Sequence, residues 1–129
     1  MIPKYKAWDK VNKKMIEDVA SIHFKSEMIA TSNLCFYPFK DIELLQSTGL
    51  FDKNGKKVFE SEIVDVRTLE GTIYLRGVVK KVKGSFYIEG LHFSKNIPLT
   101  DFYFKSYTNT LEIEILGNVY QDEHLLGKD

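Results

Sequence analysis

The sequence predicts a single β-rich domain whose antiparallel strands close into a small barrel or sandwich. Apolar and polar residues alternate with a period of two along much of the chain, which is typical of half-buried strands. Turn sequences rich in glycine and asparagine separate these stretches at the spacing seen in all-β folds, and helical periods are few. A length of 129 residues fits one domain.

In the first half of the chain, residues 5–9 alternate and predict a strand, and the polar residues that follow are suited to a turn. Residues 15–24 fit either a short helical face or a return strand, and their β-branched side chains favour the strand. The apolar run 34–37 closes at Pro38, because proline cannot donate to a strand ladder. Residues 41–46 fit either a short strand or one helical turn.

Asn54-Gly55 lies between Leu50-Phe51 and Val58-Phe59 and predicts a hairpin tip with a type I′ turn. Further strands are expected over residues 63–67, 72–82, 85–93, 102–107 and 111–116, with turns at Glu70-Gly71, Lys83-Gly84 and Thr108-Asn109. Residues 121–126 predict a helical turn. Since no linker or repeat interrupts the chain, we expect one domain over residues 1–129 with an internal seam near residue 60, between portions 1–60 and 61–129.

The charge balance disfavours whole classes of function. Lysine plus arginine and aspartate plus glutamate each total 18, for a net charge of +0, which argues against a strongly basic nucleic-acid binder. Lysines concentrate near the start and acidic residues near the end, so the two ends can pair within a subunit or between subunits. No signal-peptide core is visible and no apolar run approaches the roughly 18–20 residues of a membrane span, so we expect a cytoplasmic protein.

Three segments in the order start, middle and end resemble the YopX family of phages and prophages of Gram-positive bacteria. The segments are Ile2-Pro3-Lys4-Tyr5-Lys6-Ala7-Trp8-Asp9, the run from Leu44 to Glu60 that leads into Glu62-Ile63-Val64, and Gly117-Asn118-Val119-Tyr120. The resemblance implies an α+β fold rich in β structure, with an N-terminal α+β portion packed with a C-terminal antiparallel small β-barrel. It also implies phage origin, and it brings no known activity with it.

Two positions depart from the family pattern. The chain has Glu60-Ser61-Glu62 where the family usually has Glu-Gly-Asp, which loses the backbone freedom of glycine at position 61. It also reads Asp122-Glu123-His124 where the family often has a proline.

Sequence motifs for catalysis, metal binding and nucleotide binding are absent, so we expect no catalytic residue, metal site or cofactor. Cys35 lies in an apolar run and is expected to be a small buried hydrophobe. His23, His92 and His124 lack metal-ligand spacing. The densest acidic cluster is Glu60, Glu62 and Asp65, which motivates one hypothesis of a small metal-dependent enzyme beside the simpler interpretation of a solvated turn.

A second hypothesis is a nucleic-acid-binding module of phage replication or regulation. Basic and aromatic residues interleave on one expected hairpin, as they do on small barrels that hold single strands. The candidates are Arg76, Lys80, Lys81, Lys83 and Tyr87. Because neighbouring residues of a strand face opposite sides, these side chains cannot all share one face.

The leading hypothesis is a non-enzymatic accessory protein of a phage or prophage that acts by binding. The partner is expected to be a host or phage protein, and the protein itself is expected to form a homo-oligomer. Candidate interface residues are Trp8, also expected as a core anchor, together with Tyr103 and Tyr107, because tyrosine and tryptophan are enriched at interfaces.

Overall fold

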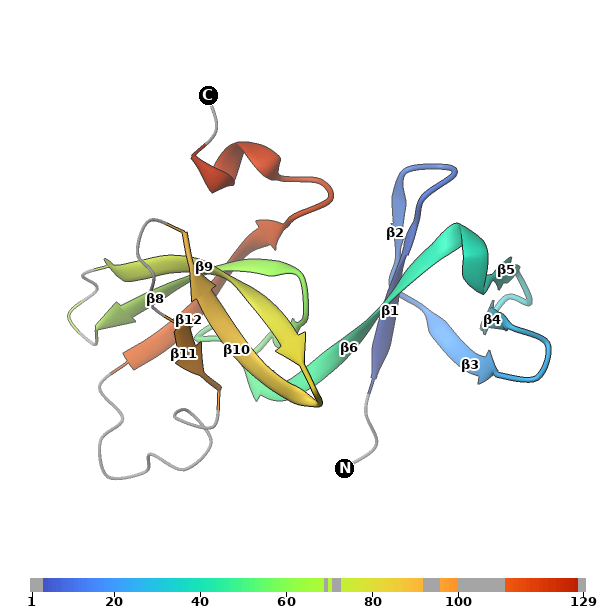
Figure 1. Cartoon of the computed structure of the whole chain (residues 1–129), viewed down its shortest axis with the longest axis horizontal. Coiled ribbons are helices and arrows are strands. Elements are labelled where there is room, and N and C mark those ends of the chain that lie inside the picture. Colours follow the sequence, from blue (N-terminus) through green and yellow to red (C-terminus); the bar gives the residue numbers. More distant parts are fainter. Residues whose placement is uncertain (1–3, 69, 71–72, 92–95, 100–110, 128–129) are drawn as a thin grey trace. The chain divides into compact units, whose positions relative to one another are not determined.

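Strands make up most of the computed structural model, which describes residues 4–68, 70, 73–91, 96–99 and 111–127 (Figure 1). The strands are β1 (Tyr5–Asp9), β2 (Lys14–Ile16), β3 (Val19–His23), β4 (Met28–Thr31), β5 (Phe36–Pro38), β6 (Ile42–Phe51), β7 (Lys57–Phe59), β8 (Glu62–Thr68), β9 (Ile73–Val82), β10 (Ser85–Gly90), β11 (Asn96–Pro98) and β12 (Leu111–Asn118). Two short 3-10 helices, η1 (Phe39–Asp41) and η2 (Glu123–Leu126), complete the described elements.

The expected α+β class is wrong, because the described residues of the first portion form strands and one three-residue 3-10 turn. The ambiguous segment 15–24 belongs to two strands, β2 and β3, as its β-branched residues favour. Residues 42–46 begin β6 rather than a helical turn. The expected closed barrel is also wrong. The described strands of the second portion form a five-stranded sheet in which β11 and β12 are the two ends of the strand order.

The chain divides into two compact units, Met1–Ser47 and Thr48–Asp129. β6 contributes residues to both units. Its first half pairs with β1, which belongs to the first unit, and the strand is also the neighbour of β7, which belongs to the second unit. The expectation of a single domain over residues 1–129 is not tested by this division and stays a prediction.

In the first unit, β1 lies between β2 and β6, and β4 lies between β3 and β5. The core is small: Ala7, Ile16, Ile29 and Ile42 are buried, and partly buried side chains such as Val19 and Tyr37 pack against them. The β1–β2 turn is held by the buried carboxylate of Asp9, which accepts hydrogen bonds from the backbone N–H groups of Val11 and Asn12. The first family segment therefore forms a central strand that ends at a turn-forming aspartate.

The second unit is built on a five-stranded antiparallel sheet in the order β11-β10-β9-β8-β12. One face of this sheet forms the larger core, which contains Val58, Val64, Val66, Leu75, Val79, Ile88, Ile97, Leu99 and Ile113. Because strand residues alternate between faces, the intervening residues of β8 and β9 lie on the opposite face of the sheet.

The two predicted hairpin turns have different outcomes. The β9–β10 turn is confirmed at Lys83-Gly84, where both residues have positive φ angles of 51° and 83°, as a type I′ turn requires. A hairpin tip between β6 and β7 is confirmed as well, but its type I′ geometry is wrong, since Gly55 has a φ of 81° and Asn54 is not among the positive-φ residues. The cause is Asp52, whose Oδ1 accepts the backbone N–H groups of Asn54 and Lys56 at 2.9 Å each.

Candidate functional site

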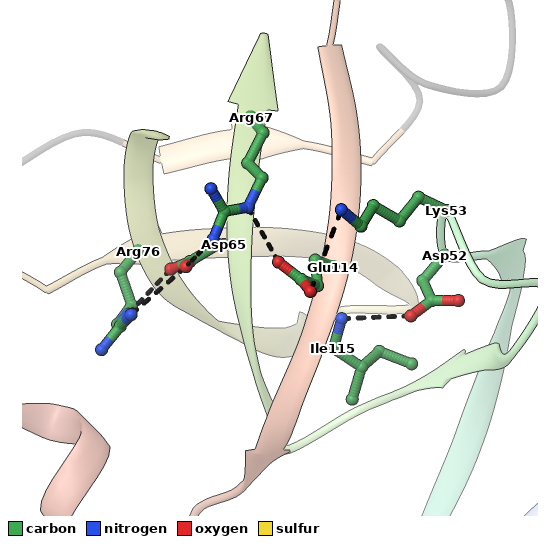
Figure 2. Close-up of polar contacts among 7 residues, drawn as sticks. All are labelled: Asp52, Lys53, Asp65, Arg67, Arg76, Glu114 and Ile115. Atoms are coloured by element: carbon green, nitrogen blue, oxygen red, sulfur yellow. Dashed lines mark hydrogen bonds and ion pairs between the residues drawn. The ribbon is translucent and has the colours of Figure 1, made fainter. Parts of the chain in front are cut away.

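Charged side chains gather on the face of the five-stranded sheet opposite its core, which we call the charged face. Asp65 of β8 lies across from Arg76 of β9 on one side and from Glu114 of β12 on the other. Arg67 lies two residues further along β8 on the same face. Figure 2 shows these side chains linked into one chain of ion pairs across the three strands.

Asp65 is the centre of this network and is completely buried. Arg76 Nε donates to Asp65 Oδ1 at 2.7 Å, and Arg67 Nη2 donates to Asp65 Oδ2 at 3.3 Å. The hydrogen bond to Asp65 raises the pKa of the Arg76 guanidinium above its ordinary value. A buried carboxylate held between two guanidinium groups is compensated in charge, so Asp65 fits a structural role better than acid–base chemistry.

The network continues to the β6–β7 hairpin tip. Arg67 Nε donates to Glu114 Oε1 at 2.8 Å, and Lys53 Nζ lies 4.0 Å from Glu114 Oε2. Next to this pair, Asp52 Oδ2 accepts the backbone N–H of Ile115 (Figure 2). The Lys53 N–H donates to the carbonyl of Ile113. The hairpin tip thus occupies part of the outer edge of β12, which would otherwise be open to another strand.

The acidic cluster singled out from the sequence is separated by the fold. Glu62 Oε1 accepts the backbone N–H of Phe59 at 2.6 Å and is 8% exposed, whereas Asp65 belongs to the ion pairs of the charged face. Glu60 is half-buried and lines a pocket described below. Among the described residues, no three His, Cys, Asp or Glu side chains are grouped so that they could hold a metal ion.

The basic residues of the β9–β10 hairpin are divided between the two faces and the turn. Arg76 and Lys80 lie on the charged face, and each has an acidic partner: Lys80 Nζ lies 2.8 Å from Glu89 Oε1, and this hydrogen bond raises the pKa of Lys80. Lys81 lies on the other face, with its Nζ 5.7 Å from the centre of the Phe86 ring. Lys83 is in the turn, and Tyr87 lies opposite Lys80. Nucleic-acid binding by these residues stays a prediction.

A pocket of about 590 Å³ lies in the second unit beside the Lys80–Glu89 pair, and we call it the outer pocket. Its volume falls within the roughly 300–1,000 Å³ of typical ligand sites. Its lining residues are Glu60, Ser61, Val78, Val79, Lys80, Lys81, Glu89, Leu91, Val119 and Leu126. The pocket therefore combines apolar walls with one half-exposed ion pair, Lys80–Glu89, in which the side chains are 47% and 46% exposed.

The C-terminal segment, residues 117–126, forms one wall of the outer pocket. Its backbone path is set by residues 117–120, the third of the segments that resemble the family. Asn118 Oδ1 accepts the backbone N–H groups of Tyr120 and Gln121, and the Asn118 N–H donates to Asp122 Oδ2. Position 117 needs glycine, because a Cβ there would overlap the side chain of Asp122. The Val119 N–H also donates to the carbonyl of Ser61, which ties the segment to the turn before β8.

The remaining candidates are placed as follows. Trp8 is 7% exposed, which agrees with its expected role as a core anchor, while its interface role stays a prediction. Tyr103, Tyr107 and His92 lie outside the described residues. Cys35 is exposed, so the expectation of a buried thiol is wrong.

Sequence reasoning missed the partners of Asp65. The signal was present as charges two residues apart, Asp65 with Arg67 on one strand and Glu112 with Glu114 on another. Such spacing places charges on a common face of each strand, but it does not reveal which strands pair.

These features define a β-sheet protein with a shallow amphipathic pocket and a structural ion-pair network. The sequence matches the family model described as YopX protein over residues 4–127, so the chain belongs to the YopX family, as its resemblance predicted. No curated protein matches the chain.

Among solved structures, the chain is similar to the crystal structure of protein EF1440 from Enterococcus faecalis, with 23% identity and a TM-score of 0.68 over 98% of this chain and 99% of that chain. At this identity, the likeness shows a shared fold. In the part of the chain that is described, no helix is long and apolar enough to cross a membrane.

Proposed function

We propose that this protein is a non-enzymatic binding module that holds a segment of another protein in the outer pocket. The observation that carries the proposal is the combination of apolar walls with a partly exposed ion pair in a pocket of ligand-binding size. Such a surface can bury an apolar side chain of a peptide and can orient the peptide through contacts with its polar groups. A second, smaller pocket of about 450 Å³ lies in the first unit and is lined by Lys4, Tyr5 and residues 17–22.

The arrangement of charges favours this function over the two alternatives. A metal-dependent enzyme would need Glu60, Glu62 and Asp65 together, and the fold gives Asp65 two arginine partners and Glu62 a backbone donor. A nucleic-acid module would need unneutralised cations, and Arg76 and Lys80 are each paired with a carboxylate. The family's phage context supports a host or phage protein as the partner.

A capture experiment with matched variants tests the proposal. The tagged protein is incubated with a Gram-positive host lysate, with and without nuclease, beside the variants Leu91→Glu in the pocket wall and Val11→Glu in the first unit. Val11 is 65% exposed, so Val11→Glu is a control for adding one negative charge at an apolar position. We expect one protein that survives nuclease to be retained by the wild type and Val11→Glu and lost with Leu91→Glu. Retention of the same partner by Leu91→Glu, or loss of all bound material after nuclease, would refute the proposal.

A further inference from the structure

We infer that the three-stranded sheet of the first unit binds the same sheet of a second copy of this chain, face to face. The sheet has the strand order β3-β4-β5 (Figure 1). The inference goes beyond the proposed function, because this sheet lies in the first unit and contributes no residue to the outer pocket. Three features carry it: exposed apolar side chains, a face that is complementary to itself, and opposite charges at the two ends of the sheet.

The two faces of this sheet have different surroundings. On the inner face, Ile22, Ile29 and Tyr37 lie opposite one another on the three strands and pack in the core of the first unit. Because neighbouring residues of a strand point to opposite sides, the residues before and after these three lie on the other face, which we call the apolar face. Its residues are Ser21, Ala30 and Phe36 in one row and His23, Met28 and Pro38 in the next row.

Large apolar side chains are exposed on this face and in the turns at its ends. Phe36 is 56% exposed, while Phe24 and Leu34, in the turns at opposite ends of the sheet, are 75% and 74% exposed. Leu34 also has a φ of 62°, which is unusual for a bulky residue. Three of the six large apolar side chains that are exposed in the described residues therefore belong to this small sheet and its turns. Such clustering marks an interaction surface.

A second copy fits this surface because the face is complementary to itself. In a pair related by a two-fold axis across the strands, each strand lies over the same strand of the other copy in the reverse direction. The row that contains Phe36 then faces the row that contains Pro38, so the aromatic ring meets the proline ring. In the same way, Met28 of one copy lies over Ala30 of the other, whose small, buried side chain leaves room for it.

The charges at the two ends of the sheet favour this reversed arrangement. Within two residues of the strand ends, one end carries Glu17 and Asp18, and the other carries Lys25, Lys40 and Glu27. Glu17 and Lys25 are both exposed, and neither forms an ion pair within the described residues. In the reversed pair, the end with Lys25 meets the end with Glu17 of the second copy, twice by symmetry, which favours this orientation over the parallel one.

The small size of the face sets the strength of the pairing. The three strands have five, four and three residues. A face of this size buries less than the roughly 800 Å² per partner of a standard interface. We therefore expect a weak dimer whose population rises with protein concentration.

Sedimentation velocity of the full chain at increasing concentration tests the inference. We expect a monomer–dimer equilibrium with a dissociation constant on the order of 10–100 µM. Phe36→Glu should raise this constant about tenfold or more, because it places a charge in the apolar contact. The matched control is Phe51→Glu, which makes the same change at a phenylalanine of the second unit that is also 56% exposed and should dimerise like the wild type.

Exchange of the end charges tests the orientation at exposed positions that do not belong to the core. Lys25→Glu and Glu17→Lys are each expected to weaken the dimer several-fold at low salt, because each places like charges opposite one another. The double variant Lys25→Glu/Glu17→Lys should recover the wild-type dissociation constant, since opposite charges then face each other again.

The inference is overturned by any of three results. These are a wild type that stays monomeric at the highest concentration, which would leave the apolar face to a different protein, a folded Phe36→Glu variant that dimerises like the wild type, and a double charge variant that is no stronger than the single ones. Circular dichroism shows whether Phe36→Glu is folded, and the charge variants decide the question if it is not. The proposed function is tested separately, by capture with Leu91→Glu.

Discussion

Ser61 adopts a backbone conformation that suits glycine. Its φ is 70°, in the left-handed region, while its N–H donates to the carbonyl of Val79 and its own carbonyl accepts the Val119 N–H. These hydrogen bonds fix the conformation and leave the serine Cβ in a strained position. The departure from the family's usual glycine, visible in the sequence, therefore falls at a position where glycine would be favoured.

We expect Ser61→Gly to raise the free energy of unfolding by about 0.5–1 kcal/mol, because glycine adopts this φ without the left-handed penalty. Urea denaturation measures the change, and Ser61→Ala is the control, since alanine keeps the Cβ and should not stabilise. A lower stability for Ser61→Gly than for Ser61→Ala would show that the conformation is not strained.

Asp9 makes the first unit sensitive to acid. Its pKa is lowered from the ordinary value of 3.8, chiefly because the backbone N–H of Asn12 donates to the carboxylate. A carboxyl whose pKa is lower in the folded state stabilises the fold above its unfolded pKa. This contribution is lost as the pH falls through its folded pKa.

We therefore expect Asp9→Asn to lower the melting temperature near pH 6 and to differ less from the wild type near pH 3, because below the unfolded pKa of 3.8 the contribution of the charged carboxyl is progressively lost. Thermal unfolding at both pH values measures the two differences. A gap that is equal at both pH values would mean that the charge of Asp9 does not contribute.

At the scale of elements, one aspartate joins the β6–β7 hairpin to β12. The Asp52 carboxylate accepts three backbone N–H groups, from Asn54, Lys56 and Ile115, and Asp52 is 6% exposed. We expect Asp52→Ala to cost about 2–3 kcal/mol, because three partly buried backbone N–H groups lose their acceptor, and Asp52→Asn to cost less, since its amide oxygen still accepts. Denaturation and amide hydrogen exchange at Ile115 measure both effects, and unchanged exchange in Asp52→Ala would contradict the link.

We expect the ion pairs across β9, β8 and β12 to contribute unequally to the free energy of unfolding, most at Asp65 and least at Lys53. Arg76→Met removes the closest partner of the buried Asp65 carboxylate, so we expect a loss of about 2–3 kcal/mol. The matched control is Lys53→Met at the far end, where the 4.0 Å pair with Glu114 is partly exposed and a loss below about 1 kcal/mol is expected. Urea denaturation of both variants decides the point, and equal losses would contradict a centre at Asp65.

The sequence predicted the elements better than their turn geometry. The strand expected over residues 63–67 and the turn at Lys83-Gly84 are confirmed, because alternation and a glycine after a polar residue are local signals. The geometry at Asn54-Gly55 was missed because a side chain two residues earlier, Asp52, offers the backbone N–H groups a local acceptor. The α+β class was wrong because it came from family likeness, whereas the helical turn expected over residues 121–126 is present as η2.

At the scale of the whole molecule, the candidate site was the least predictable feature. The outer pocket joins Ser61, Val78, Leu91 and Leu126, and only the pairing of strands and the course of the C-terminal segment bring these residues together. Alternation did predict that the hairpin lysines divide between faces, and Lys80 and Lys81 do so. Which acidic residues pair with these lysines depends on the register between neighbouring strands. The pattern of a single strand does not determine that register.

The two units differ in the size of their cores, and this difference predicts an order of unfolding. The buried apolar cluster of the first unit, around Ile29, is smaller than that of the second unit, around Val79 and Ile88. A small core supplies little stability to a short segment of chain. The single tryptophan, Trp8, reports on the first unit, and hydrogen exchange of residues 73–91 reports on the second.

We expect the urea midpoint from Trp8 fluorescence to fall below the midpoint at which the 73–91 amides lose protection. Ile29→Ala should lower the first midpoint and leave the second nearly unchanged, and Val79→Ala should do the opposite, because each deletes side-chain volume from one core only. If both substitutions shift both midpoints equally, the units unfold together. In that case β6, which contributes residues to both units, would be the element through which the loss of one core destabilises the other.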